Sequence, residues 1–183
     1  HGLPIWSGSS VRRLRRCAMA LSIALLTISD TRRLADDSSG DQLQRSLEAA
    51  GHRLHERQLC PDDCYQIRRE LSRWIADPAV DVVITSGGTG LTGRDGTPEA
   101  VVPLLDKTME GFGELFRVLS FESIGTSTLQ SRCLAGVANG TFVFVLPGSL
   151  DAVTTAWNRL IRAQLDADTR PCNLAQLRAR LKE

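Results

Sequence analysis

Hydroxyl side chains and glycines follow one another in a stretch of the chain that could hold an anion. The stretch consists of Thr85, Ser86, Gly87, Gly88, Thr89 and Gly90. Glycine allows positive φ angles and removes side chains from the loop surface, so successive backbone N–H groups can converge on a phosphate. The stretch is therefore predicted to bind a phosphorylated ligand. Taken alone, however, a glycine-rich loop is better explained as a flexible surface loop without a ligand.

Two aspartates could supply a metal site beside this loop. Asp95 lies between the glycines and a helix start at Thr97-Pro98, where its carboxylate could share a divalent cation with bound phosphates. Asp62 follows Cys60-Pro61 and, in isolation, is most simply an acid that compensates a helix dipole.

Two standard nucleotide-binding motifs are excluded. The glycines at 88, 90 and 93 match the GxGxxG spacing, but a dinucleotide site needs its third glycine inside a helix. Here the segment 94–98 keeps the chain irregular. A P-loop is excluded because no Gly-Lys-Ser or Gly-Lys-Thr follows the glycines.

Composition is typical of one globular domain. The chain has 183 residues, 42% hydrophobic and 23% charged, with a net charge of +1, which gives no bulk electrostatic argument for nucleic-acid or membrane binding.

The apolar run near the N-terminus, 17–28, is too short to span a bilayer and is better explained as a buried strand. Five cysteines without a framework spacing predict reduced thiols in the cytoplasm. They are Cys17, Cys60, Cys64, Cys133 and Cys172.

Strands and helices are predicted to alternate along the chain. Apolar runs predict strands at 22–28, 82–85 and 141–146, and an alternating pattern predicts a more exposed strand at 52–59. Helices are expected at 39–50, at 61–77, at 98–107, at 111–119, in a short piece of 127–138 that carries Ser131 and Arg132, and after the caps Ser149 and Asn173. Ser39 and Gln42 would form a capping box, Pro61 would occupy a first helical position, Thr97 would cap its helix, and 121–126 would be irregular.

This alternation predicts a three-layer α/β/α fold with a mostly parallel sheet. Such sheets bind ligands beyond the carboxyl ends of their strands. Four polar segments leave predicted strand ends and can converge on one rim: 29–30, 61–62, 85–95 and 147–149. That convergence would bring Asp62 to the predicted anion site, which weakens its explanation as a dipole-compensating acid.

Together these segments resemble the MoaB/MogA family of molybdenum cofactor biosynthesis proteins, over residues 21–173. The motifs that carry the resemblance are Thr27-Ile28-Ser29-Asp30-Thr31-Arg32, Asp36-Asp37-Ser38-Ser39-Gly40, Thr85-Ser86-Gly87-Gly88-Thr89-Gly90 and Arg94-Asp95-Gly96-Thr97-Pro98-Glu99-Ala100. The segments 110–114 and 127–132, with Leu146-Pro147-Gly148-Ser149, are more similar to the MoaB branch.

The resemblance implies a MogA/MoaB-like molybdopterin-binding domain at 17–183, after a disordered tail or expression remnant at 1–16. Molybdopterin is a phosphorylated pterin bearing a dithiolene. In the adenylylating members it is activated by ATP and Mg²⁺ with release of pyrophosphate, and no tightly bound cofactor is expected. The catalytic and metal-binding carboxylates of that adenylyltransferase activity match Asp62 and Asp95. The implied pterin and phosphate contacts are Thr85, Ser86, Gly87, Gly88, Thr89, Gly90, Ser131, Arg132, Pro147, Gly148 and Ser149.

Three alternatives stay open on the sequence. The protein could be a catalytically silent molybdopterin-binding or carrier protein for other proteins of the pathway, because some MoaB-branch members do not adenylylate. It could also bind a different phosphorylated ligand. Arg132 could be solvated or lie in a subunit contact. The resemblance further implies a homotrimer, or a hexamer that pairs two trimers.

Overall fold

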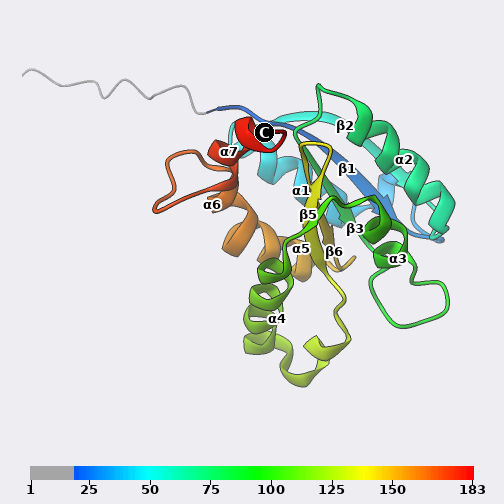
Figure 1. The fold of residues 1–183 in the computed structure, drawn as a ribbon. Helices are drawn as coiled ribbons and strands as arrows, with labels where there is room; N and C mark the ends of the chain where they lie inside the picture. Colours follow the sequence, from blue (N-terminus) through cyan, green and yellow to red (C-terminus); the bar gives the residue numbers. More distant parts are fainter. Residues whose placement is uncertain (1–18) are drawn as a thin grey trace, which may run out of the picture.

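The computed structural model describes residues 19–183, so the predicted tail at 1–16 and Cys17 lie outside the described residues. A six-stranded sheet with the order β2-β1-β3-β6-β5-β4 runs through the molecule (Figure 1). Its strands are β1 (Ser22–Ile28), β2 (Arg53–Cys60), β3 (Val82–Ser86), β4 (Lys107–Thr108), β5 (Leu134–Ala138) and β6 (Thr141–Leu146). Strands β2, β1, β3 and β6 are parallel, whereas β5 and β4 are antiparallel additions at one edge. The predicted mostly parallel sheet is confirmed.

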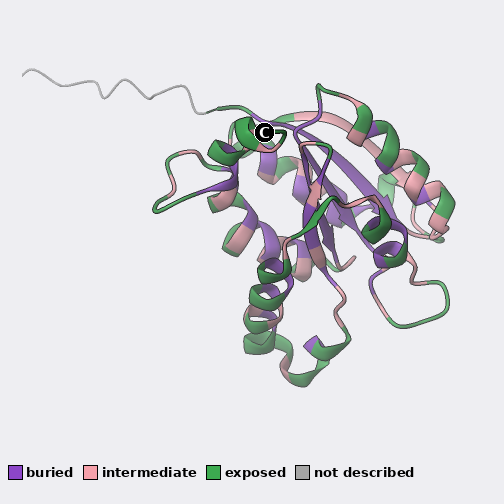
Figure 2. Cartoon of the chain, viewed as in Figure 1, coloured by how far each residue is buried: buried purple, intermediate pink, exposed green. Residues whose placement is uncertain are grey.

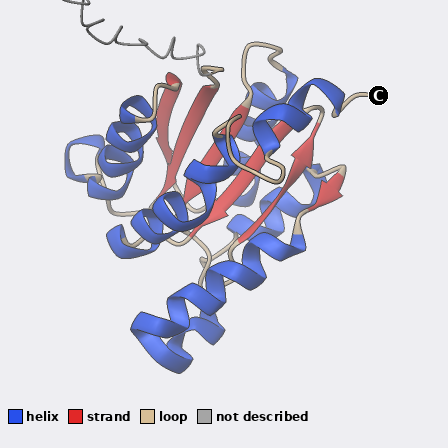
Figure 3. Cartoon of the chain, turned by 90° about the vertical axis from the view of Figure 1, so that its left-hand side faces the viewer, coloured by secondary structure: helices blue, strands red, loops and turns tan. Residues whose placement is uncertain are grey.

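Helices cover both faces of this sheet, which completes the predicted three layers (Figure 3). The helices are α1 (Ser38–Ala49), α2 (Cys64–Ala76), α3 (Thr97–Val101), α4 (Glu110–Ile124), α5 (Leu150–Ala156), α6 (Arg162–Leu165) and α7 (Leu174–Leu177). One π-helical turn, η4 (Trp157–Ile161), joins α5 to α6. Short 3₁₀ turns are η1 (Leu34–Asp36), η2 (Val102–Leu104), η3 (Gly125–Gln130) and η5 (Arg178–Arg180).

The central strands are buried on both sides, as their continuous apolar sequences require (Figure 2). Alternate residues enter two separate cores because successive strand side chains point to opposite faces. Ile23 and Ile84 pack in the core under α1, α4 and α5, whereas Leu26 and Val83 pack in the core under α2 and α3. The sheet therefore holds the two helical layers in fixed positions relative to its strand ends.

Two predicted helix starts are wrong in detail. Helix α1 is capped by Asp37, whose Oδ1 accepts a 3.0 Å hydrogen bond from the Gly40 amide, and the predicted capping box at Ser39 does not form. Helix α2 begins after Asp63, whose Oδ1 accepts hydrogen bonds from the amides of Tyr65 and Gln66. In both cases a carboxylate reaches the free amides of the first turn better than the predicted residue does.

Thr97 does not cap α3. It is the first helical residue, and its hydroxyl instead donates a 3.0 Å hydrogen bond to the Gly87 carbonyl. The helix is shorter than the predicted 98–107, because the chain passes through η2 into the edge strand β4.

The segment 121–138 was predicted least well. Helix α4 continues to Ile124, so 121–126 is mostly helical rather than irregular. A short helix was expected within 127–138 with Ser131 and Arg132 on it. The 3₁₀ helix η3 covers 127–130 but ends at Gln130, so Ser131 and Arg132 lie outside it, ahead of β5. Strand β5 pairs antiparallel with β6 through a two-residue turn at Asn139-Gly140, where both φ angles are positive (49° and 79°). An Asn-Gly pair beside an apolar run is a local signal for such a hairpin, and the prediction missed it.

The remaining elements agree with the predictions. Ser149 caps α5 with a 3.2 Å bond from the Ala152 amide, and Asn173 caps α7 with a 2.8 Å bond from the Gln176 amide. The four described cysteines form no disulfide. None of the helices between residues 19 and 183 is long and apolar enough to cross a membrane.

Candidate functional site

The carboxyl ends of the four parallel strands meet at one rim of the sheet. Two backbone hydrogen bonds of 3.0 Å extend the strand pairing past the strand ends, from the Ser29 amide to the Cys60 carbonyl and from the Gly87 amide to the Leu146 carbonyl. The polar segments after β1, β2, β3 and β6 consequently lie next to one another, and the loop after β3 runs along this rim (Figure 1).

The glycine loop requires its glycines for both backbone angle and space. Gly87 has a φ of +106° and Gly88 a φ of +66°, angles that L-residues with side chains rarely adopt. A Cβ on Gly87 would collide with the Ile28 carbonyl. A Cβ on Gly88 would collide with the Thr97 hydroxyl and lie 2.6 Å from Oδ2 of Asp62. Bare backbone at this loop therefore lets β1, α3 and Asp62 approach it closely.

Asp62 is fixed at the loop by its own backbone and by one carboxylate oxygen. Its amide donates a 3.0 Å hydrogen bond to Oδ1 of Asp30, and its Oδ1 accepts a 3.1 Å hydrogen bond from the Gly96 amide. Its Oδ2 accepts no hydrogen bond from any residue between 19 and 183. Burial raises the pKa of Asp62, and the charges of Asp95 and Asp30 raise it further. The hydrogen bond from the Gly96 amide acts in the opposite direction and lowers the pKa.

Asp95 is held by the turn that precedes it. Its Oδ2 accepts a 2.9 Å bond from the amide of Thr92 and a 2.6 Å bond from the hydroxyl of the same residue. The hydroxyl bond of Thr92 is the main reason that the pKa of Asp95 is lowered, so this acid stays ionised at neutral pH. A Cβ on Gly90 would lie 2.6 Å from the same Oδ2. Both predicted acids thus border the glycine loop and lie near enough for the charge of one to shift the pKa of the other.

Two arginines tie the loop to its surroundings. Arg94 forms a two-pronged ion pair with Asp30, with distances of 2.9 and 2.7 Å. Arg132 donates through Nε to the Gly90 carbonyl and through Nη2 to the Asp95 carbonyl, each at 2.8 Å, and through Nη1 to the Glu99 carboxylate. Arg132 was predicted to contact the substrate, whereas Arg94 and Glu99 were not singled out. The position of Arg94 directly before Asp95 is the one sequence signal that could have identified it.

The turn after β6 packs against the glycine loop. The Gly148 carbonyl accepts bonds from the Arg32 guanidinium (3.1 Å) and the Ser39 hydroxyl (2.8 Å). A Cβ on Gly148 would lie only 3.2 Å from Cα of Gly87, so the two backbones are almost in contact. The first-strand motif, the glycine loop and the predicted Pro147-Gly148-Ser149 segment therefore form one continuous structure.

Three predicted hydroxyl residues lie deeper than the loop surface. Thr85, Ser86 and Thr89 are buried, and Thr85 is completely inaccessible with an Oγ1 that has no hydrogen-bond partner. Ser131 Oγ also lacks a partner. The Ser131 side of the rim opens into a small cavity of about 130 Å³ that Pro147 and Ser149 also line.

The two aspartates, Asp62 and Asp95, fit a cation that enters the site bound to substrate phosphates. The described residues contain no group of three or more His, Cys, Asp or Glu side chains that could hold a metal ion. Mg²⁺ typically binds one or two carboxylates and completes its octahedron with substrate phosphates and water. The free Oδ2 of Asp62, facing bare backbone at Gly88, fits that donor set.

Comparisons with known proteins identify the family of this chain. A family model described as "Probable molybdopterin binding domain" matches residues 24–167. Two relatives named Molybdenum cofactor biosynthesis protein B support the match. The one from Escherichia coli K12 is 54% identical over 151 residues, which cover 82% of this chain and 89% of the relative. The one from Halalkalibacterium halodurans is 46% identical over 142 residues, covering 77% and 84%.

The chain belongs to the MoaB/MogA family of molybdenum cofactor biosynthesis proteins. Solved structures of the family share its fold. A crystal structure of Molybdenum cofactor biosynthesis protein B has a TM-score of 0.78 at 43% identity, covering 80% of this chain and 91% of that one. The tungsten cofactor synthesizing protein MoaB from Pyrococcus furiosus has a TM-score of 0.73 at 34% identity, covering 80% and 93%. The family resemblance carried by the sequence motifs is thereby confirmed.

Proposed function

We propose that this MoaB/MogA family protein acts in molybdenum cofactor biosynthesis by binding molybdopterin and adenylylating it. An oxygen of the pterin phosphate would attack the α-phosphorus of ATP, a new P–O bond would form, and the bond to the β-phosphate would break with release of pyrophosphate. The observation that carries this proposal is the close approach of Asp62 to Gly88 and of Asp95 to Gly90 on one loop of bare backbone.

The loop and its neighbours would bind and orient the pterin. Backbone amides of residues 88–90 would hold its phosphate, whereas the Gly87 amide, also expected to do so, is bonded to the Leu146 carbonyl. The buried hydroxyls of Thr85, Ser86 and Thr89 would support the loop from below. Ser131 and the turn at Pro147, Gly148 and Ser149 would border the pterin, since Ser131, Pro147 and Ser149 line one cavity and Gly148 packs against Gly87 of the loop. Orientation of the two reactants is the larger part of catalysis in phosphoryl-type transfers.

The two aspartates would hold Mg²⁺ together with the ATP phosphates. The metal would offset the repulsion between two anionic substrates and the charge of the leaving pyrophosphate. Asp95, ionised and aligned by Thr92, would present a full negative charge to it. Asp62 would use the carboxylate oxygen that accepts no hydrogen bond from residues 19–183.

A second candidate is a catalytically silent molybdopterin-binding or carrier protein of the same pathway. The similarity to relatives named Molybdenum cofactor biosynthesis protein B supports it, since some members of the MoaB branch do not adenylylate. Such a protein would keep the pterin site without requiring either acid for its role.

One assay separates the two candidates. The purified protein is incubated with molybdopterin, ATP and Mg²⁺, and both adenylylated pterin and pyrophosphate are quantified. If the protein adenylylates molybdopterin, Asp62→Asn and Asp95→Asn should abolish product formation but still bind the pterin. The control variant Asp168→Asn, at an exposed position, should form product as the unmodified protein does. Pterin binding without any product from the unmodified protein would reject adenylylation and leave the carrier.

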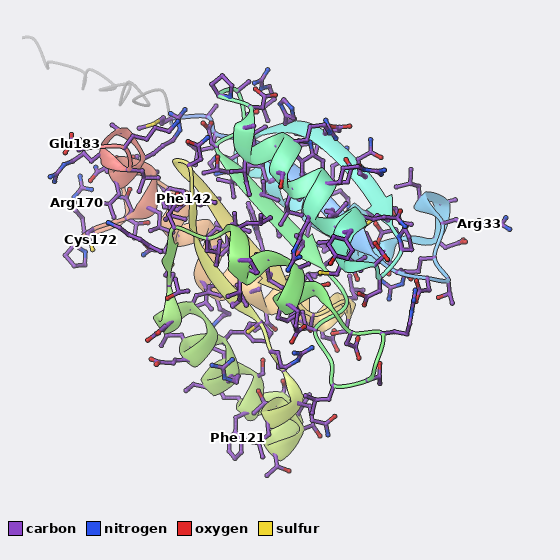
Figure 4. All side chains as sticks on the ribbon, turned by 45° about the vertical axis from the view of Figure 1, so that its right-hand side comes forward. Arg33, Phe121, Phe142, Arg170, Cys172 and Glu183 are labelled. Atoms are coloured by element: carbon purple, nitrogen blue, oxygen red, sulfur yellow. The ribbon has the colours of Figure 1, made fainter. Side chains whose placement is uncertain are left out.

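The proposal includes a cytoplasmic homotrimer or a hexamer made from two trimers. Helix α4 exposes a row of apolar side chains at helical spacing, consisting of Leu115, Val118, Phe121 and Ile124. Phe121 points outward from the end of this helix (Figure 4). A row of this kind on one helix is typical of a surface that another subunit covers.

A further inference from the structure

We propose that Arg132 is a positioning residue, which holds Asp95 in place by fastening both ends of the loop 90–95 to α3. It would act through the loop rather than by direct contact with the pterin or the nucleotide. This inference deepens the proposed adenylylation and rests on it for its catalytic consequence. The structural part of the inference, that Arg132 keeps the loop ordered, stands without it.

The three hydrogen-bonding nitrogens of Arg132 each have a different protein partner. Nε and Nη2 bind the carbonyls of Gly90 and Asp95, the first and last residues of the loop, at 2.8 Å each. Nη1 binds the carboxylate of Glu99, which lies on α3. A single planar guanidinium thus joins the two ends of the loop to the helix that follows it.

The loop has few other supports. Residues 91–94 are exposed, and Leu91 has 69% of its surface accessible. Within the loop, backbone and side-chain bonds link Thr92 to Asp95, and outside it Arg94 reaches the exposed Asp30. Exposed ion pairs such as that of Arg94 and Asp30 contribute little to stability. Directly after the loop, the Gly96 amide bonds to Oδ1 of Asp62. Among residues 19–183, Arg132 is therefore the side chain that joins both ends of the loop to α3.

Arg132 is itself well anchored. It directly precedes the buried Cys133 and strand β5, whose Leu134 pairs with Val145 of β6. The guanidinium therefore extends from the edge of the central sheet across to the loop. Arginine suits this function because its rigid fork presents donors in several fixed directions, whereas the single ammonium of lysine cannot bind three separated acceptors with the same geometry.

The consequence for Asp95 follows from its two attachments. Thr92 holds its carboxylate, and Arg132 holds its carbonyl. With the Gly96 amide still bonded to Asp62, loss of the Arg132 bonds would let residues 90–95 move about that fixed point, so the Asp95 carboxylate would no longer keep one position relative to Asp62. The acids would then meet Mg²⁺ less often in the correct geometry, although the pterin site on the glycines would persist.

The test compares Arg132→Lys and Glu99→Gln with Arg159→Lys, in which the arginine belongs to an exposed pair with Glu122 away from the loop. Amide hydrogen exchange of residues 90–96 is measured first, because it needs no substrate. Both loop variants should exchange faster there, whereas Arg159→Lys should match the unmodified protein. Unchanged exchange in both loop variants would overturn the proposal.

Kinetics and binding then separate positioning from direct contact. For Arg132→Lys we expect kcat to fall by about 10- to 100-fold, as for other residues that orient metal ligands, with a higher Mg²⁺ requirement and an unchanged Kd for molybdopterin. A Kd that rises by the same factor as kcat/KM falls would show direct contact and overturn the inference. If the unmodified protein makes no adenylylated pterin, the proposed activity fails, and hydrogen exchange alone decides the role of Arg132.

Discussion

The amide of Gly96 donates a 3.1 Å hydrogen bond to Oδ1 of Asp62, across 34 positions of sequence. Gly96 directly follows Asp95, so the backbone beside one acid is tied to the carboxylate of the other. The Asp62 carboxylate is thereby fixed relative to the backbone next to Asp95, whose own carboxylate is held by Thr92. This bond also leaves Oδ2 of Asp62 free for a ligand.

Replacement of Gly88 by alanine should destabilise the protein and disturb Asp62. The new Cβ would lie 2.6 Å from Oδ2 of Asp62, and the φ of +66° is unfavourable for any residue with a side chain. The backbone strain alone costs about 1–2 kcal/mol. Urea unfolding and the adenylylation assay measure the two effects.

Gly93→Ala is the matched control for Gly88→Ala. No atom lies within 4 Å of a Cβ at Gly93, and its φ is not positive. Its free energy of unfolding should stay within about 0.5 kcal/mol of the unmodified value. An equal loss in both variants would show that the close approach to Asp62 has no energetic importance.

Asp37→Asn should cost about 3 kcal/mol of folding free energy. The buried carboxylate accepts bonds from the Thr27 hydroxyl (2.6 Å), the Arg57 guanidinium (2.9 Å) and the Gly40 amide (3.0 Å). An asparagine would place an NH₂ donor against one of these donors and leave Arg57 poorly compensated. Urea denaturation measures the change, and the exposed neighbour Asp36→Asn should be nearly neutral.

Glu56 should make stability depend on acid pH. Bonds from Arg73, Gln58 and Trp74 lower its pKa from 4.5 to about 2. Between these two pH values the unfolded chain binds the proton more readily than the folded protein, so the stability that Glu56 contributes is complete above pH 4.5 and is lost as the pH falls toward 2.

The urea midpoint, measured from pH 6 to about pH 3, tests this dependence. The Glu56→Gln variant should have a smaller decrease in midpoint over this range than the unmodified protein, because it lacks the titrating carboxylate. Identical slopes for the two proteins would contradict the prediction.

Charged residues on the exposed face of α4 should dissociate the proposed trimer or hexamer. Val118 and Phe121 are 62% and 57% exposed in the single chain, so Val118→Glu and Phe121→Glu should fold normally. In an assembly they would bury unpaired charges, which is strongly unfavourable. Light scattering gives the subunit number.

Tyr65→Glu is the control for the α4 variants, because Tyr65 is 75% exposed on α2, over the opposite face of the sheet. The mass of this variant should equal that of the unmodified protein. If both α4 variants also keep that mass, the α4 face is not the subunit interface.

Local sequence signals predicted the strands that are buried on both faces of the sheet. The apolar runs of β1, β3 and β6 predict buried parallel strands, because any register in the middle of the sheet buries them on both faces. The same signals failed at 127–138. Strand β5 is short, and the signal that marks it is the turn that follows: Asn139 and Gly140, both with positive φ, join β5 to β6 as a two-residue hairpin.

The sequence by itself determined the fold class, the family, the glycine loop and the two acids, because these depend on residue types in a fixed order. The tertiary structure alone decided what Arg94 and Arg132 do. Their partners lie up to 64 positions away, at Asp30 for Arg94 and at Gly90, Asp95 and Glu99 for Arg132. An arginine can reach acceptors in many directions, and only the order of the strands brings one particular set within hydrogen-bond distance.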